Sequence, residues 1–129
     1  MGAVLLDTTV LIDVLRGRPA AGHLRALRSR DLVYVCAINI EEIMRGIRPH
    51  EIAAATHLFN GLRIAPLERE EGELAGGWRR SFGAKGVTLS QADCLVAASA
   101  LGVSARLATG NPKDFPMPDL IVDVWPVGA

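Results

Sequence analysis

The sequence predicts an α/β protein with a mainly parallel sheet, and two observations carry this prediction. The first is the run Val4-Leu5-Leu6, which has no polar alternation and stops abruptly at Asp7. Such a run is typical of a central strand that is buried on both faces of a parallel sheet. The second is that strand-like and helix-like patterns alternate along the whole chain.

The first half of the chain, up to the helix end at Asn60-Gly61, shows this alternation of strand-like and helix-like patterns. We expect a helix at 10–15, a helix around 24–28, a strand at 32–36, a helix from 39 to 46 and a helix from 49 to 60. Gly17 and Pro19 separate the first two helices. Asn39 is a candidate helix cap, and the pair Asn60-Gly61 marks the last helix end.

The second half continues the pattern with weaker signals. We expect a short strand or extended link at 62–65, a helix at 68–82, a helix starting at 90, a strand at 106–109 and a last strand at 120–125. Several glycines weaken the pattern at 68–82, whereas Ser90 opens a strongly apolar helix. A loop rich in turn residues follows Thr109.

Length and composition favour one domain over residues 1–129. Of these residues 50% are hydrophobic, which is enough for one core, and the formal net charge is +0. Nucleic-acid binding would therefore depend on local basic patches. Cys36 and Cys94 fall in apolar patterns and are interpreted as small buried side chains. We expect no signal peptide before Val4 and no membrane span, hence a soluble, cytoplasmic protein.

Four acidic residues fall where strands give way to helices or loops. Asp7 ends the first strand, Glu42 and Asp93 each lie one turn into a helix, and Asp114 follows the strand at 106–109. Because the carboxyl ends of parallel strands meet at one edge, these side chains could share a pocket. Crowded carboxylates repel one another unless a cation lies among them. Oxygen ligands suit Mg²⁺ or Mn²⁺, which can activate water for phosphodiester cleavage.

Each acid also has a structural explanation. Ser90 and Asp93 fit a capping box, in which the carboxylate only bonds the Ser90 backbone. Glu42 lies beside Glu41, and one of the two could be solvated helix surface. Asp114 could be a turn residue. A coincidence of four such residues is less probable than any one of them alone.

Polar and basic residues near these acids have two readings as well. Thr8, Thr9 and Asn111 could orient water or phosphate, or could serve as caps and turn residues; Thr9 is best placed to cap the helix after Asp7. Five arginines lie in the N-terminal third, at Arg16, Arg18, Arg25, Arg28 and Arg30. They could form a basic rim that holds a polyanion, or a solvated helix face.

Four stretches resemble a PIN domain, and specifically the VapC-type toxins of bacterial toxin–antitoxin pairs. They are 6–13 (LDTTVLID), 37–46 (AINIEEIMRG), 92–100 (ADCLVAASA) and 109–115 (TGNPKDF), in the family's order. Any one of them is a weak match, and the four together are a strong one. This chain departs from the family's frequent choices at Thr9, Asn39 and Gly110.

The resemblance implies a PIN-like three-layer α/β/α sandwich with a mainly parallel central sheet. It implies a Mg²⁺- or Mn²⁺-dependent endoribonuclease in which Asp7 and Asp93 hold the metal. Glu42, preferred over Glu41 by its position in the motif, and Asp114 would complete the site or position water. Asn111 could supply the fourth position instead of Asp114. The family also implies a homodimer and a cognate VapB-like antitoxin.

Two rival functions and one interface follow from the sequence. The first rival is a non-catalytic PIN-like binding module whose acidic pocket receives a basic partner segment. The second is a PIN nuclease acting on structured DNA, which the short chain disfavours. The helix at 49–60 carries more apolar side chains, such as Leu58 and Phe59, than packing on one sheet face needs. We therefore expect the homodimer interface on this helix.

Overall fold

The computed structural model describes residues 2–128, which form a sheet of five parallel strands. The strands are β1 (Ala3–Leu6), β2 (Leu32–Val35), β3 (Arg63–Ile64), β4 (Arg106–Thr109) and β5 (Val122–Val124), in the spatial order β3-β2-β1-β4-β5. In the register of the sheet, Val4 lies opposite Val33 of β2 and Arg106 of β4. The run that ends at Asp7 is therefore the central strand, as its apolar pattern predicts.

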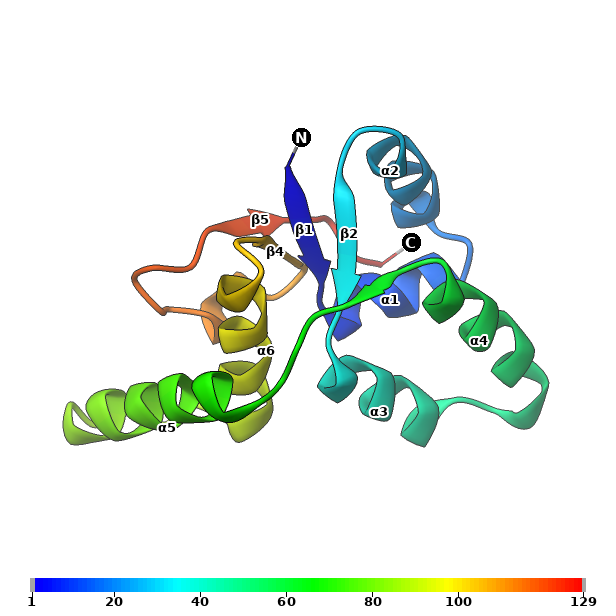
Figure 1. Cartoon of the computed structure of the whole chain (residues 1–129). Helices are drawn as coiled ribbons and strands as arrows, with labels where there is room; N and C mark the ends of the chain where they lie inside the picture. The colour runs from blue at the N-terminus through cyan, green and yellow to red at the C-terminus, as the bar shows by residue number, and fades with distance from the viewer. Residues whose placement is uncertain (1, 129) are drawn as a thin grey trace.

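Helices cover both faces of this sheet (Figure 1). They are α1 (Thr8–Leu15), α2 (Pro19–Arg28), α3 (Ala37–Gly46), α4 (Ile52–Asn60), α5 (Arg69–Ala84) and α6 (Gln91–Gly102), with short 3-10 turns η1 (Pro49–Glu51) and η2 (Pro112–Asp114). The α/β class and the layered sandwich expected from the sequence are confirmed. Figure 1 also shows α5 projecting outward beyond α6.

Two apolar cores lie back to back across the sheet, and β1 contributes to both. Leu5 packs into the core under α5 and α6, while Val4 and Leu6 pack into the core under α1, α2 and α4. All three side chains are 0% exposed. Because successive residues of a strand point to opposite faces, only an unbroken apolar run can fill both cores.

Two expected helix starts are wrong by one or two residues. The helix after β1 begins at Thr8 with Asp7 at the cap position, so Thr9 is not the cap. The helix after β2 begins at Ala37 with Cys36 at the cap position, so Asn39 lies inside its first turn. At α1 no side chain caps the helix, whereas at α3 the Asn39 Oδ1 accepts the Cys36 backbone N–H at 3.3 Å from the third helical position.

Leu58 and Phe59, the side chains expected to mark a dimer interface on α4, pack inside the protein. Leu58 is buried, with 8% exposed, and Phe59 is partly buried against the same core as Val4 and Leu6. The surplus of apolar residues on this helix is explained by contacts with α1 and α3. Sequence counts of apolar residues cannot distinguish such helix–helix packing from an exposed face.

Both cysteines are buried, as their apolar contexts predict. Burial is the main cause that raises the pKa of the Cys36 thiol and of the Cys94 thiol. Neither is therefore poised as a nucleophile or metal ligand. Between residues 2 and 128, no helix combines the length and the apolar character needed to cross a membrane.

Candidate functional site

The carboxyl ends of β1 and β4 bring Asp7 and Thr109 side by side. The Thr109 hydroxyl donates a hydrogen bond of 2.8 Å to Asp7 Oδ2, and both side chains are buried. The Asn39 side-chain amide approaches Asp7 Oδ1 at 3.4 Å from the first turn of α3. Asp7, at 8% exposed, is therefore a carboxylate fixed by donors from two other elements.

A second chain of hydrogen bonds links α1 to α3. Asn39 Nδ2 donates to Thr8 Oγ1 at 3.0 Å, and the Thr8 hydroxyl donates to Glu42 Oε1 at 2.7 Å. Glu41, by contrast, lies 3.8 Å from Arg45 and its side chain is 62% exposed. Of the two neighbouring acids, the structure brings Glu42 into the polar cluster and leaves Glu41 on the surface.

Asp93 lies at the start of α6, where Ser90 caps the helix. The Ser90 hydroxyl accepts a hydrogen bond of 3.0 Å from the Asp93 backbone N–H. The cap is thus supplied by the Ser90 side chain, and the Asp93 carboxylate is half-buried. Burial raises the pKa of Asp93, the Ser90 hydroxyl lowers it, and the charges of Asp114 and Glu42 raise it again.

The loop after β4 organises the remaining expected residues. The Asn111 side-chain amide donates to Asp114 Oδ2, and the Asn111 backbone N–H donates to Thr109 Oγ1 at 3.0 Å. The Gly110 backbone N–H donates to Thr9 Oγ1 at 3.0 Å. Asn111 and Asp114 therefore act as a bonded pair, and Thr9 holds the loop against α1.

The negative charges of neighbouring acids act on two of the four expected acids, Asp7 and Asp93. Burial raises the pKa of Asp7; the Thr109 hydroxyl and the Thr8 amide oppose this shift, and the charges of Asp93 and Glu42 add to it. Asp93 is in turn coupled to Asp114. Carboxylates whose pKa is raised by neighbouring negative charges are typical of a shared acidic site.

The cluster is open rather than a finished coordination sphere. Within residues 2–128, no three side chains of His, Cys, Asp or Glu lie together as a ready set of metal ligands. Mg²⁺ is commonly held by one or two carboxylates and keeps several of its waters, so a closed set of protein ligands is not required. The donor set is oxygen only, and the charge of Asp93 acts on Asp7, which fits this ion class.

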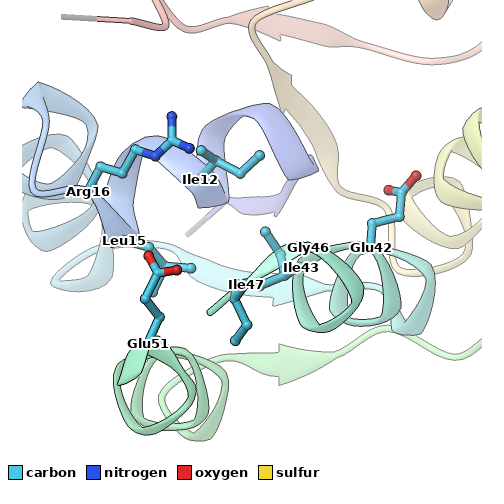
Figure 2. A pocket seen from close by; sticks show the side chains of 8 residues that line it. All are labelled: Ile12, Leu15, Arg16, Glu42, Ile43, Gly46, Ile47 and Glu51. Carbon is cyan, nitrogen blue, oxygen red and sulfur yellow. The ribbon is translucent and has the colours of Figure 1, made fainter. Parts of the chain in front are cut away.

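A small cavity opens beside Glu42, between α1 and the α3–η1 segment. It has a volume of about 110 Å³, and its lining residues are Ile12, Leu15, Arg16, Glu42, Ile43, Gly46, Ile47 and Glu51. Figure 2 shows Glu42 at one end and Arg16 with Glu51 at the other. The cavity is therefore apolar along its length, with charged groups at both ends.

The expected basic rim is mostly absent from this place. Arg18 pairs with Asp13 at 2.7 Å, while Arg25 and Arg28 line a groove between α2 and α4. Arg16 is the one of the five that lines the cavity with Glu42. Arg16 and Arg18 lie in the link between α1 and α2, Arg25 and Arg28 lie on α2, and Arg30 follows it, so closeness in sequence did not make one patch.

Sequence reasoning missed two residues of the cluster, Thr109 and Asn39. Thr109 was assigned to a strand, although a hydroxyl at the end of a strand next to β1 carries the same positional signal as Asp7. The sequence predicts Asn39 as a helix cap, and its Oδ1 does accept the Cys36 N–H; the missed feature is that its Nδ2, fully buried, also donates to Asp7 and Thr8. A buried amide needs such partners, because its polar atoms are costly to bury unpaired.

Comparison with known proteins gives this arrangement a family. The family model described as PIN domain matches residues 4–116. The chain belongs to the PIN-domain family. This PIN domain is 32% identical to Ribonuclease VapC19 of Mycobacterium tuberculosis over 119 residues, which covers 90% of this chain and 95% of the relative. That likeness places it among the VapC ribonucleases.

Solved structures agree with the fold of this PIN domain. It matches the DNA-bound VapBC of Salmonella typhimurium with a TM-score of 0.84 at 19% identity, over 97% of this chain and 99% of the other. It matches FitAcB of Neisseria gonorrhoeae with a TM-score of 0.73 at 26% identity, over 92% of this chain and 95% of the other.

Proposed function

We propose that this protein is a Mg²⁺- or Mn²⁺-dependent endoribonuclease and the toxin of a type II toxin–antitoxin pair. The observation that carries the proposal is buried Asp7 at the carboxyl edge of the sheet, held by Thr109 and Asn39 and joined to Glu42 through the Asn39–Thr8 hydrogen bonds. Burying mutually repelling carboxylates destabilises a fold unless a cation relieves the repulsion, so the arrangement has a function as its best explanation. The likeness to Ribonuclease VapC19 gives the substrate class.

The four acids would divide the work by position. Asp7 and Asp93 would hold the metal, while Glu42 and the Asn111–Asp114 pair would position the attacking water and receive its proton. A bound Mg²⁺ or Mn²⁺ supplies charge stabilisation at the scissile phosphate and lowers the pKa of water. Thr109 and Asn39 orient the Asp7 carboxylate through their hydrogen bonds.

The partner we propose is a VapB-like antitoxin, which would meet the toxin in the cytoplasm. Related solved structures from Salmonella typhimurium and Haemophilus influenzae are VapBC proteins. The cavity beside Glu42 is apolar between charged ends, which suits a protein segment that carries apolar and basic side chains. The same acidic cluster would receive its basic group.

The rival function is a PIN-like module that binds the same partner but does not cleave RNA. A non-catalytic module would need the acidic pocket only to bind a basic segment. Fixing a carboxylate with a buried threonine and a buried asparagine orients its oxygens, which a metal ligand needs and a contact with a flexible basic segment does not. The bonded state of Asp7 therefore favours the nuclease.

RNA cleavage by the purified, antitoxin-free protein tests the proposal. Cleavage should appear with Mg²⁺ or Mn²⁺ and stop in EDTA. Asp7→Asn and Asp93→Asn should each lower the rate by roughly two to three orders of magnitude. Both variants should retain the parent's far-UV circular dichroism spectrum. Full activity in both would refute the site, and tight antitoxin binding without any cleavage would favour the binding module.

A further inference from the structure

Asp13 is a buried carboxylate that the acidic site does not use. It is 2% exposed, and its Oδ1 accepts a hydrogen bond of 2.7 Å from Arg18 Nη1. Its Oδ2 accepts a second one, also 2.7 Å, from the backbone N–H of Gly128. Asp13 therefore ties the C-terminal end of the described chain to helix α1.

The residues before Gly128 are anchored as well. The Trp125 backbone N–H donates to the Thr109 carbonyl at 2.9 Å, and its side chain is 2% exposed. The Trp125 ring stacks on His23 of α2 with the ring centres 3.9 Å apart. The segment Trp125–Gly128 is thus fixed at both of its ends, beside the carboxyl end of β4.

Between these anchors, Val127 covers Gly110. A Cβ placed on Gly110 would lie 3.0 Å from the Val127 Cβ and closer still to both of its methyl groups. Side chains of real proteins do not approach so closely, so Val127 occupies the place that a side chain at position 110 would need. Val127 is itself 43% exposed, so it does not serve as an ordinary core residue.

Helix α1 presents both anchoring acceptors on one face. Thr9 and Asp13 are four residues apart, which places them one turn above each other. Thr9 accepts the Gly110 N–H at 3.0 Å, and Asp13 accepts the Gly128 N–H at 2.7 Å. The site loop and the C-terminal segment therefore lie side by side along α1, with Val127 against the loop.

We propose that Trp125–Gly128 is a strap that sets the loop of the acidic site, with Val127 as a positioning residue and Asp13 as its anchor. Gly110 lies between Thr109, which bonds Asp7, and Asn111, which bonds Asp114. By packing against Gly110, Val127 therefore restrains both the Thr109–Asp7 and the Asn111–Asp114 hydrogen bonds. The positioning role of the strap rests on the proposed metal site. Its contact with the loop at Gly110 does not depend on that proposal.

Amide hydrogen exchange of the metal-free protein, followed by NMR, tests that grip. Val127→Ala should speed exchange of the Gly110 and Asn111 amides about fivefold, because the Thr9 bond to Gly110 is loosened. Val124→Ala is the matched control, since it removes the same two methyl groups from a side chain that is 57% exposed. It should leave those amides unchanged. Both variants should keep the parent's urea midpoint.

A compensating substitution separates positioning from general stability. Gly110→Ala should also speed exchange in the loop, because its new methyl group collides with Val127. Gly110→Ala combined with Val127→Gly, which removes the whole Val127 side chain including its Cβ, should return the loop exchange close to the parent rate. Equal exchange in Val127→Ala and Val124→Ala, or additive effects in the double variant, would overturn the strap.

Mn²⁺ titration then connects the strap to the site. Val127→Ala should weaken Mn²⁺ binding about tenfold, the low end for outer partners of metal ligands, and Val124→Ala should not. Faster loop exchange with unchanged Mn²⁺ affinity would overturn the positioning role. If the parent itself fails to bind Mn²⁺, the proposed metal function and the positioning role both fall, and the exchange data still decide whether the strap holds the loop.

Discussion

The Thr109 hydroxyl donates to Asp7 Oδ2 at 2.8 Å, although the two residues are 102 positions apart in the chain. The bond joins the ends of β4 and β1, which are neighbours in the sheet. Thr109 Oγ1 also accepts from the Asn111 N–H at 3.0 Å. One hydroxyl therefore orients the central carboxylate and the loop that carries Asp114.

Thr109→Val should test this connection, because valine keeps the shape of threonine and removes the hydroxyl. Asp7 then loses one donor, and the pKa of its carboxyl should rise further. We expect Mn²⁺ affinity, measured by calorimetry, to fall about 10- to 100-fold, as for other outer partners of metal ligands. Thr109→Ser keeps the hydroxyl and should bind close to the parent. Equal binding by the valine variant would show that the bond has no role in the site.

The neighbouring acids Glu41 and Glu42 offer a matched pair on one helix. Glu42 accepts from Thr8 at 2.7 Å, whereas Glu41 is an exposed partner of Arg45. Glu42→Gln should lower metal-dependent RNA cleavage about 100-fold, and Glu41→Gln should change it less than about twofold. Initial rates at saturating Mg²⁺ measure both. A larger loss of activity in Glu41→Gln than in Glu42→Gln would show that Glu41, not Glu42, belongs to the site.

The local parts of this fold were predictable, and the long-range contacts were not. Val4 to Leu6 could be recognised as the central strand because the absence of polar alternation is visible within the run itself. Thr109 and Asn39 were missed because their partner, Asp7, lies 102 and 32 residues away. Such contacts depend on the strand order of the sheet, which local patterns do not specify.

The oligomeric state remains a prediction, with a changed surface. Since Leu58 is buried, the large apolar side chains that α3 and α4 leave exposed are Met44 at 39% and Ile52 at 44%. We expect a homodimer that buries them, and light scattering should give twice the chain mass of 13.8 kDa at tens of micromolar. Met44→Glu with Ile52→Glu should shift the mass to the monomer. A parent that is already monomeric would contradict the prediction.

Asp13 predicts a loss of stability at low pH. Burial opposes its ionisation, but the Arg18 hydrogen bond and the Gly128 N–H lower the pKa of Asp13 overall. A lowered folded pKa contributes stability that is present above the unfolded pKa and is lost as the pH falls through the folded pKa. Asp13→Asn should cost about 2 kcal/mol in urea unfolding at pH 7 and much less in acid. Asp119→Asn, on the exposed surface, is the control and should cost almost nothing.

Asp7 predicts the opposite dependence on pH. Burial, with added repulsion from Asp93 and Glu42, raises its pKa in the fold. A raised carboxyl pKa means that the folded state binds the proton more tightly, so stability falls as the pH rises from the unfolded to the folded pKa. Asp7→Asn keeps the shape and removes the charge. In EDTA at neutral pH, this variant should therefore melt no lower than the parent, and we expect it to melt higher.

Metal addition completes the test of Asp7, because a ligand stabilises only the state that binds it. Millimolar Mg²⁺ should raise the melting temperature of the parent and raise that of Asp7→Asn much less. At Mg²⁺ about 100 times its dissociation constant, the parent should gain about 2.7 kcal/mol. A carboxylate that merely capped a helix would behave differently: its substitution would cost about 1 kcal/mol and neither protein would respond to Mg²⁺. That second pattern, measured by calorimetric scans in EDTA and in Mg²⁺, would mean that the four carboxylates do not share a metal site.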